Sequence, residues 1–317
     1  MKTPTHWKSK NLLSLVLWPL GYLYNLATRL RIKFATPLNA SKTVICIGNL
    51  TAGGSGKTPV AVSVAEILQS AGFSPFFISR GYGGTLQDII VDPQKHSASE
   101  VGDEPLLLAR QAPVCVNAKR FWAAQKAIEN GADVIVMDDG FQNPGLVKDI
   151  SFLVFDGSFG CGNGFGIPAG PMRENLKQGL KRADAIIIIG EDRHNLSTRF
   201  SDKPVFQGFI TPKQTAVGNT PAIAFAGIGR PEKFYESMRT QGFNLTETID
   251  FPDHHQYTEP ELQTIIDKAA KNGAEIYTTS KDFVKIPAPL RKYFKVLEIE
   301  ITWKDKQALT DFLINKI

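Results

Sequence analysis

A glycine-rich turn that ends in lysine and threonine constrains this chain more than any other segment. It consists of Thr51, Ala52, Gly53, Gly54, Ser55, Gly56, Lys57 and Thr58. A β-branched run at 44–47 precedes it, and apolar residues at helical spacing follow it from Val60 onward. Strand, glycine-rich loop and helix in this order indicate a P-loop, although the usual pattern has glycine where this chain has Thr51. The lysine then reaches the β- and γ-phosphates of a nucleotide, and the hydroxyl of Thr58 can ligate Mg²⁺.

The pattern of the rest of the chain predicts an α/β protein with two domains. It has 317 residues, 43% of them hydrophobic, which is enough for two moderate domains. Uninterrupted apolar runs alternate with helical patterns up to residue 189, and this predicts a P-loop NTPase-like, mainly parallel sheet. The composition changes at 211–221, where a second α/β pattern begins. We expect a membrane-associated helix at 1–35, a nucleotide-binding domain at 36–212, and a smaller α/β domain at 213–317.

Positive charge is concentrated near the N-terminus. The formal charge is +5, yet residues 1–87 hold nine Lys and Arg against a single acid, Glu66. Six of these cations flank the uncharged, apolar segment 11–28. This pattern predicts a helix that lies on an anionic membrane. The segment is also at the lower limit of the length that can span a bilayer. The alternative is a helix that packs on its own globular domain. The cations do not form a groove-length patch, so nucleic-acid binding is not expected, and no obligate protein partner is evident.

Three widely spaced cysteines, Cys46, Cys115 and Cys161, argue against a disulfide framework and against a zinc site. A reducing cytosolic environment fits this usage best. The glycine- and proline-rich segment 157–171 is too long for an ordinary connection inside an α/β domain, which indicates a functional loop.

Several polar residues follow predicted strands or begin predicted helices. Asp138 and Asp139 come directly after an apolar strand, where a carboxylate of a P-loop protein holds Mg²⁺. Asp103 stands at the start of a predicted helix. There it could either cap the helix or take part in catalysis. The remaining candidates are Arg80 after a strand, His254 in the Pro-Asp-His-His segment, and Arg173 with Glu174 at the end of the glycine-rich segment; each also fits a surface loop.

Taken together, these segments resemble the tetraacyldisaccharide 4'-kinase family. The matching stretches occur in order along most of the chain, and Thr51 is the form that this family has in its loop. They are 48–51 running into 53–59, 79–83, 101–105, 138–142, 168–174, 225–229 and 251–255. The chain departs from the family pattern at Met172, where leucine is usual, and at Ser280, where we expect glutamate.

The resemblance implies a function and roles for the candidates. It implies transfer of the γ-phosphoryl group of ATP to the 4'-hydroxyl of a tetraacylated glucosamine disaccharide 1-phosphate, a lipid A precursor, at the cytoplasmic face of the bacterial inner membrane. It further implies that Asp103 with His254 activates the acceptor hydroxyl, that Mg²⁺ is held by Thr58, Asp138 and Asp139, and that Arg173 and Glu174 line the cleft. Because Asp103 and His254 belong to different predicted domains, we expect the site to assemble when these domains close.

Two other classes of protein also use a P-loop. ATP-driven membrane switches place a lysine just before the glycines, where this chain has Ala52. GTP-dependent metallochaperones need an [NT]-K-x-D signature, whereas here Lys281 is followed directly by Asp282. Both alternatives are therefore disfavoured.

Overall fold

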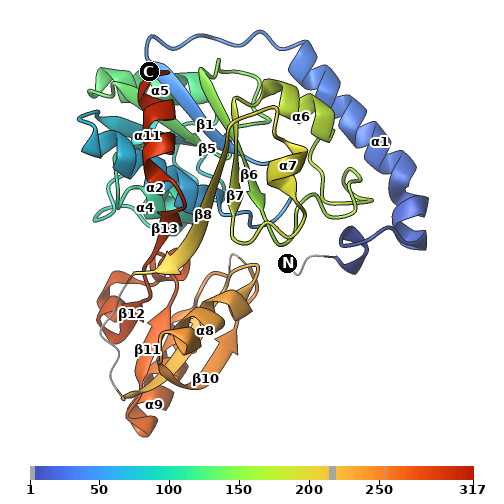
Figure 1. Cartoon of the computed structure of the whole chain (residues 1–317). Coiled ribbons are helices and arrows are strands. Elements are labelled where there is room, and N and C mark those ends of the chain that lie inside the picture. Colours follow the sequence, from blue (N-terminus) through green and yellow to red (C-terminus); the bar gives the residue numbers. More distant parts are fainter. Residues whose placement is uncertain (1–3, 214–218, 254) are drawn as a thin grey trace.

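The computed structural model describes residues 4–213, 219–253 and 255–317. They form two sheets, a large one near the N-terminal helix and a small one below it in Figure 1. The large sheet has nine strands in the order β13-β8-β7-β6-β1-β5-β2-β4-β3. Its strands are β1 (Thr43–Gly48), β2 (Pro75–Ser79), β3 (Ile89–Ile90), β4 (Val114–Val116), β5 (Val134–Asp138), β6 (Ile150–Asp156), β7 (Ala185–Ile189), β8 (Val205–Pro212) and β13 (Ile299–Trp303).

Seven of these strands run parallel, and the edge strands β3 and β13 are antiparallel to their neighbours. Side chains alternate across β1, so that Ile45 and Ile47 enter one core and Val44 and Cys46 the other. The helices that cover the two faces are α2 (Lys57–Ser70), α3 (Ala98–Val101), α4 (Asp103–Leu108), α5 (Arg120–Glu129), α6 (Leu176–Arg182), α7 (Leu196–Arg199) and α11 (Lys306–Ile314). The doubly covered parallel sheet predicted from the sequence is confirmed.

The small sheet has four parallel strands in the order β10-β9-β11-β12. Its helix α9 begins with a capping box of Thr258 and Glu261, and it ends at Gly273 in the left-handed conformation. The elements are β9 (Pro221–Ala226), α8 (Pro231–Thr240), β10 (Asn244–Asp250), α9 (Glu259–Asn272), β11 (Glu275–Thr278), α10 (Ser280–Phe283), η2 (Ala288–Tyr293) and β12 (Phe294–Val296). We call this part the small unit and the rest of the described chain from β1 onward the large unit.

The C-terminal segment belongs to the large unit, which corrects the expected extent of the smaller domain, 213–317. β13 pairs with β8, and Leu309 and Leu313 of α11 are buried in the large core. The indole Nε1 of Trp303 donates to Ser63 Oγ of α2 at 2.9 Å. β12 and β13 lie in different sheets although only two residues separate them, so the chain crosses back to the large unit between them.

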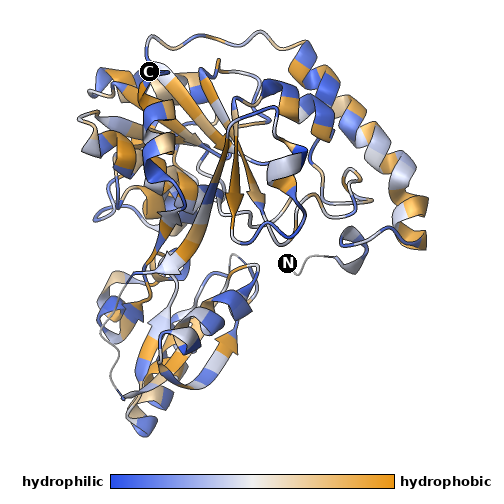
Figure 2. Cartoon of the chain, in the orientation of Figure 1, coloured by the Kyte–Doolittle hydropathy of each residue, from blue (hydrophilic) through white to orange (hydrophobic). Residues whose placement is uncertain are grey.

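Helix α1 (Leu12–Lys33), preceded by η1 (Thr5–Trp7), lies along the outside of the large unit (Figure 1). Its buried residues are Ser14, Gly21 and Thr28, seven positions apart and therefore on one face. A Cβ on Gly21 would lie 2.5 Å from the carbonyl oxygen of Gly166, so close packing on the 157–171 loop requires glycine here. Most of its large apolar side chains are exposed. Figure 2 shows hydrophobic and hydrophilic residues along this helix. In the described part of the chain, no helix combines the length and apolarity needed to cross a bilayer.

Candidate active site

The predicted P-loop connects the end of β1 at Gly48 to the start of α2 at Lys57. Gly53 and Gly56 have φ angles of 112° and 87°, a region that side chains with a Cβ rarely adopt. Asn49 is buried beneath the loop, and its Nδ2 donates to the carbonyl oxygen of Thr51 at 2.7 Å and to Ser55 Oγ at 2.9 Å. The loop is therefore held from below, and its outer face is left for a ligand.

The glycine-rich segment 157–171 lies against this loop. The backbone N–H of Ala52 donates to the carbonyl oxygen of Pro171 at 2.7 Å, and that of Arg173 donates to the carbonyl oxygen of Leu50 at 2.7 Å. At its other side the segment contacts η1, where Trp7 Nε1 donates to the carbonyl oxygen of Pro168 at 3.0 Å. The segment thus connects the surface helix to the P-loop, which gives its unusual length a physical reason.

Asp138 stands at the end of β5, beside β1 in the sheet. Its Oδ2 accepts a hydrogen bond from Thr58 Oγ1 at 2.8 Å. Its Oδ1 is buried and has no hydrogen-bond partner among the described residues. Burial, with a contribution from the charge of Glu104, raises the pKa of Asp138 to about 7. An acceptor oxygen without a donor, next to a hydroxyl at the loop, has the chemistry of a cation ligand.

Asp139 adopts a left-handed conformation, with φ 50°, and its carboxylate turns toward cations. Its Oδ1 lies 2.7 Å from Arg173 Nη1 and 3.8 Å from Lys57 Nζ. Burial acts to raise its pKa, but Lys57 and Arg173 lower it below the ordinary value. Asp139 therefore holds the side chains of Lys57 and Arg173 in place beside the P-loop.

Glu174 is buried, and both of its carboxylate oxygens have partners. Gln142 Nε2 donates to Oε1 at 2.9 Å, and Arg182 pairs with Oε2. The guanidinium of Arg182 also lies over the Phe141 ring, 4.4 Å from its centroid. Gln142 in turn donates to the carbonyl oxygen of Asn49 at 2.9 Å. Through Gln142, these contacts connect the segment after the glycine-rich loop to Asn49 at the base of the P-loop. Glu174 therefore helps to hold the P-loop in position.

Asp103 is buried at the first residue of α4, and its Oδ1 accepts a hydrogen bond from the N–H of Glu104 at 3.1 Å. His254, its expected partner, lies outside the described residues, so their pairing stays a prediction. The next histidine, His255, places Nε2 3.1 Å from Glu261 Oε1 and stacks on Phe251. His255 is thereby engaged within the small unit.

Two arginines lie near one another at this edge of the sheet, and one of them, Arg120, interacts electrostatically with both carboxylates. Arg80 follows β2 and is exposed, whereas Arg120 begins α5 and is buried. Burial, followed by the charge of Arg80, lowers the pKa of Arg120 to about 10, and Asp139 and Asp138 oppose this shift. Arg120 was not among the candidates from the sequence. The available signal was its position after the strand at 114–116, at the same edge of the sheet.

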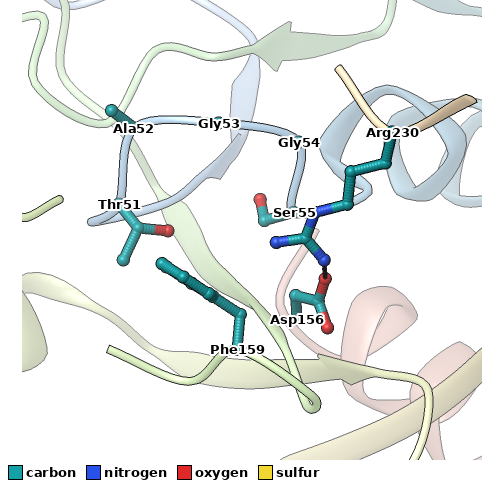
Figure 3. Close-up of a pocket in the computed structure, with 8 residues that line it drawn as sticks. All are labelled: Thr51, Ala52, Gly53, Gly54, Ser55, Asp156, Phe159 and Arg230. Atoms are coloured by element: carbon teal, nitrogen blue, oxygen red, sulfur yellow. Dashed lines mark hydrogen bonds and ion pairs between the residues drawn. The ribbon is translucent and has the colours of Figure 1, made fainter. Parts of the chain in front are cut away.

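A small pocket opens on the first half of the P-loop (Figure 3). Loop residues form one wall, and the opposite wall contains Asp156 and Phe159, from the end of β6 and the turn after it, and Arg230 from the small unit. Arg230 Nη1 pairs with Asp156 Oδ2 at 2.8 Å. Phe159 belongs to the glycine-rich segment 157–171, but nothing in the sequence indicates Asp156 or Arg230, because the proximity of these residues arises only in the folded chain.

Comparison with known proteins identifies the family. The family model described as LpxK, tetraacyldisaccharide-1-P 4'-kinase, matches residues 13–317. The chain belongs to this family. A tetraacyldisaccharide 4'-kinase of Paramagnetospirillum magneticum is 44% identical over 98% of this chain and 97% of its own length. Another, of Parvibaculum lavamentivorans, is 48% identical over 90% of this chain and 87% of its own.

A solved structure also matches over nearly the whole chain. The crystal structure of LpxK from Aquifex aeolicus in complex with ATP has a TM-score of 0.81 and 26% identity, and it covers 96% of this chain and 99% of that chain. The kinase family expected from the ordered motifs and the P-loop fold are thus both confirmed. Membership of the LpxK family also removes the switch ATPase and the metallochaperone as alternatives.

Proposed function

We propose that this chain is the kinase that transfers the γ-phosphoryl group of ATP to the 4'-hydroxyl of a tetraacylated glucosamine disaccharide 1-phosphate in lipid A biosynthesis. The observation that carries the proposal is a P-loop whose Thr58 hydroxyl meets Asp138, in a chain of the LpxK family. Phosphoryl transfer depends mainly on positioning the substrates and neutralising their charge. The P-loop, its lysine and the neighbouring carboxylates are the groups suited to these two tasks.

Residues 51–58 would bind the phosphates, with the Lys57 ammonium at the reacting end. Thr58 and Asp138 would hold Mg²⁺, since Asp138 Oδ1 has no donor among the described residues. In the described part of the chain, no group of three or more His, Cys, Asp or Glu side chains could hold a metal. This suits Mg²⁺, which proteins bind through one or two carboxylates together with substrate phosphates. When bound, Mg²⁺ neutralises charge on the phosphates.

Asp103 and His254 would accept the proton of the acceptor hydroxyl. Asp103 is buried beside Glu104, whose charge raises the pKa of Asp138, so the start of α4 faces the metal ligands. A carboxylate and an imidazole can together act as a general base near neutral pH. Arg173 is ordered by Asp139, and Arg80 is exposed at the same sheet edge. Both would contact substrate anions.

The outer surface of α1 would place the enzyme at its lipid substrate. Leu12, Leu13 and Val16 are 79%, 52% and 66% exposed, and cations stand at both ends of the helix. Apolar side chains in this arrangement favour insertion at the boundary between headgroups and acyl chains of an anionic leaflet. We place α1 on the cytoplasmic face of the inner membrane, where the acyl chains of the acceptor remain in the bilayer.

One assay tests the activity directly. Purified full-length protein is incubated with Mg·ATP labelled at the γ-phosphate and with the tetraacyldisaccharide 1-phosphate dispersed in detergent, and labelled lipid is measured. We expect label in the lipid only when both substrates are present, and none with Lys57→Ala. Hydrolysis of ATP without labelled lipid would contradict the kinase assignment.

A further inference from the structure

Asp156 forms a fixed negative charge on the side of β1 opposite to Asp138. It is the last residue of β6, which pairs with β1, and its side chain is 9% exposed. Its Oδ1 accepts hydrogen bonds from the N–H of Ser158 at 2.9 Å and from Ser158 Oγ at 2.6 Å. Its Oδ2 accepts from Arg230 Nη1 at 2.8 Å and from Lys233 Nζ at 3.4 Å. Both carboxylate oxygens are thereby oriented.

The two cations on Asp156 come from the small unit. Arg230 immediately precedes α8, and Lys233 lies in the first turn of that helix. Positive side chains at the N-terminus of a helix oppose its macrodipole, so this arrangement is unfavourable without a nearby anion. Glu232 lies in the first turn of α8, and Asp156 adds a second anion from the large unit, one that pairs directly with both cations. The contact therefore joins the two units directly beside the phosphate-binding loop.

The Arg230 guanidinium has more donors than Asp156 uses. Nη1 makes the bond to Asp156, whereas Nε and Nη2 donate to no other residue in the described ranges 4–213, 219–253 and 255–317. The guanidinium carbon lies 5.5 Å from the centroid of the Phe159 ring. Figure 3 shows a second guanidinium nitrogen directed into the pocket between Phe159 and the loop. A positive charge with free donors thus faces the outer side of the P-loop, held by a carboxylate and an aromatic ring.

We propose that Arg230 is a further nucleotide-binding residue, supplied by the small unit, and that Asp156 is the positioning residue that directs it toward the phosphates of a nucleoside triphosphate. This inference rests on the proposed binding of ATP at residues 51–58. Guanidinium groups recognise phosphate oxygens through parallel N–H donors, and a second N–H faces the pocket while the first is held by Asp156. Nucleotide in the loop then attracts the small unit toward the large unit through Arg230.

The test measures nucleotide affinity apart from catalysis. A non-hydrolysable Mg·ATP analogue is titrated calorimetrically onto full-length wild type, Arg230→Ala, Arg230→Lys, Asp156→Asn and the Arg230→Ala/Asp156→Asn double variant. We expect Arg230→Ala to raise the Kd about tenfold or more, the usual scale for a hydrogen bond to a charged group. Arg230→Lys should raise the Kd less than Arg230→Ala does, because lysine keeps the positive charge. Asp156→Asn raises the Kd less, and the double variant binds no more weakly than Arg230→Ala.

Matched controls separate this inference from the proposed function. Arg239→Ala removes a cation from the last turn of the same helix and leaves the Kd unchanged. Lys57→Ala reports binding at the loop, and the melting temperature of each variant reports folding. In the kinase assay, Arg230→Ala raises the KM for ATP but not that for the lipid acceptor.

Three results would overturn the inference. The first is a Kd equal to that of wild type in Arg230→Ala, while Lys57→Ala abolishes binding. The second is tighter binding in Asp156→Asn, because Asp156 would then compete with the nucleotide for Arg230 and not position it. The third is an equal rise in Kd in Arg230→Ala and Arg230→Lys, with a lower melting temperature in both variants. Partial unfolding would then explain the weaker binding. Failure of wild type to bind the analogue would instead count against the proposed function.

Discussion

Two neighbouring carboxylates at the end of β5 have opposite surroundings. Asp138 is buried and has a raised pKa, with one oxygen on Thr58 and the other without a donor in the described structure. Asp139 lies between Lys57 and Arg173, which lower its pKa. The sequence indicated two metal ligands here. We therefore propose Asp138 as the direct Mg²⁺ ligand and Asp139 as the residue that holds the Lys57 and Arg173 side chains in place.

Replacing Asp138 with asparagine tests this division of roles. The variant keeps the shape and the bond from Thr58 but loses the charge, so we expect turnover to fall at least about tenfold, the lower end of the effects seen on perturbing metal sites. ATP affinity measured in EDTA should stay unchanged, whereas the gain in affinity on adding Mg²⁺ should shrink. Equal Mg²⁺ dependence in wild type and variant would contradict the ligand role.

Replacing Asp103 with alanine tests the proposed base. General-base catalysis contributes about 10²–10⁴-fold in rate, so turnover should fall within that range. Nucleotide affinity should change little, because α4 contributes no residue to the phosphate-binding loop. Calorimetric titration of the ATP analogue, compared with the rate of lipid phosphorylation, separates the two effects. Loss of ATP binding in this variant would move Asp103 out of the catalytic role.

Residues that act within a local sequence pattern were predictable, and residues that meet through the fold were not. The P-loop, Asp138 and Asp139 follow from a strand, a turn and a helix in order. Arg230 and Asp156, by contrast, are 74 positions apart and belong to different units. No periodicity or spacing connects them, because their contact depends on how the small unit sits beside β6.

At the scale of elements, the ends of α9 show how closely a local signal can match the structure. Thr258 Oγ1 accepts from the N–H of Glu261, and Glu261 Oε2 accepts from the N–H of Thr258 at 2.8 Å. The N–H and the hydroxyl of Thr258, and then His255, lower the pKa of Glu261 to about 2. A carboxyl with a lowered pKa stabilises the fold above its unfolded pKa of about 4.3 and loses that contribution as the pH falls toward 2.

Glu261→Gln should therefore lower the melting temperature of the small unit at pH 6, and the difference from wild type should shrink below pH 4. Thermal unfolding followed by circular dichroism at both pH values measures this. Glu259→Gln changes the charge in the same helical turn but outside the capping box, so it serves as the control. A difference that is independent of pH would show that the Glu261 carboxylate does not contribute through its charge.

Helix α1 gives a second prediction at this scale. Changing Leu12, Leu13 and Val16 together to serine removes exposed apolar surface worth about 25 cal/mol per Å² when buried in lipid. We expect sedimentation with anionic phospholipid vesicles to weaken at least about tenfold, with ATP affinity unchanged. Ile314→Ser, an exposed apolar position on α11, is the control. Vesicle binding that equals wild type would exclude this face of α1 as the membrane contact.

At the scale of the whole molecule, the chain passes between the two units twice. It leaves the large sheet after β8 at Pro212 and returns at β13, which pairs antiparallel with β8. The sequence predicts a boundary near 213 but gives no sign of the return at β13. The reason is physical, because α11 is an ordinary short amphipathic helix that would fit on either unit.

The return of the chain predicts which unit each C-terminal helix stabilises. Leu309 of α11 and Leu262 of α9 are both fully buried, and truncating a buried leucine to alanine costs about 2–5 kcal/mol. We expect Leu309→Ala to speed amide hydrogen exchange in β1 and α2, although residue 309 lies in the last tenth of the chain. Leu262→Ala should speed exchange in β9 and α9 instead. If Leu309→Ala affected only the small unit, α11 would not belong to the nucleotide-binding core.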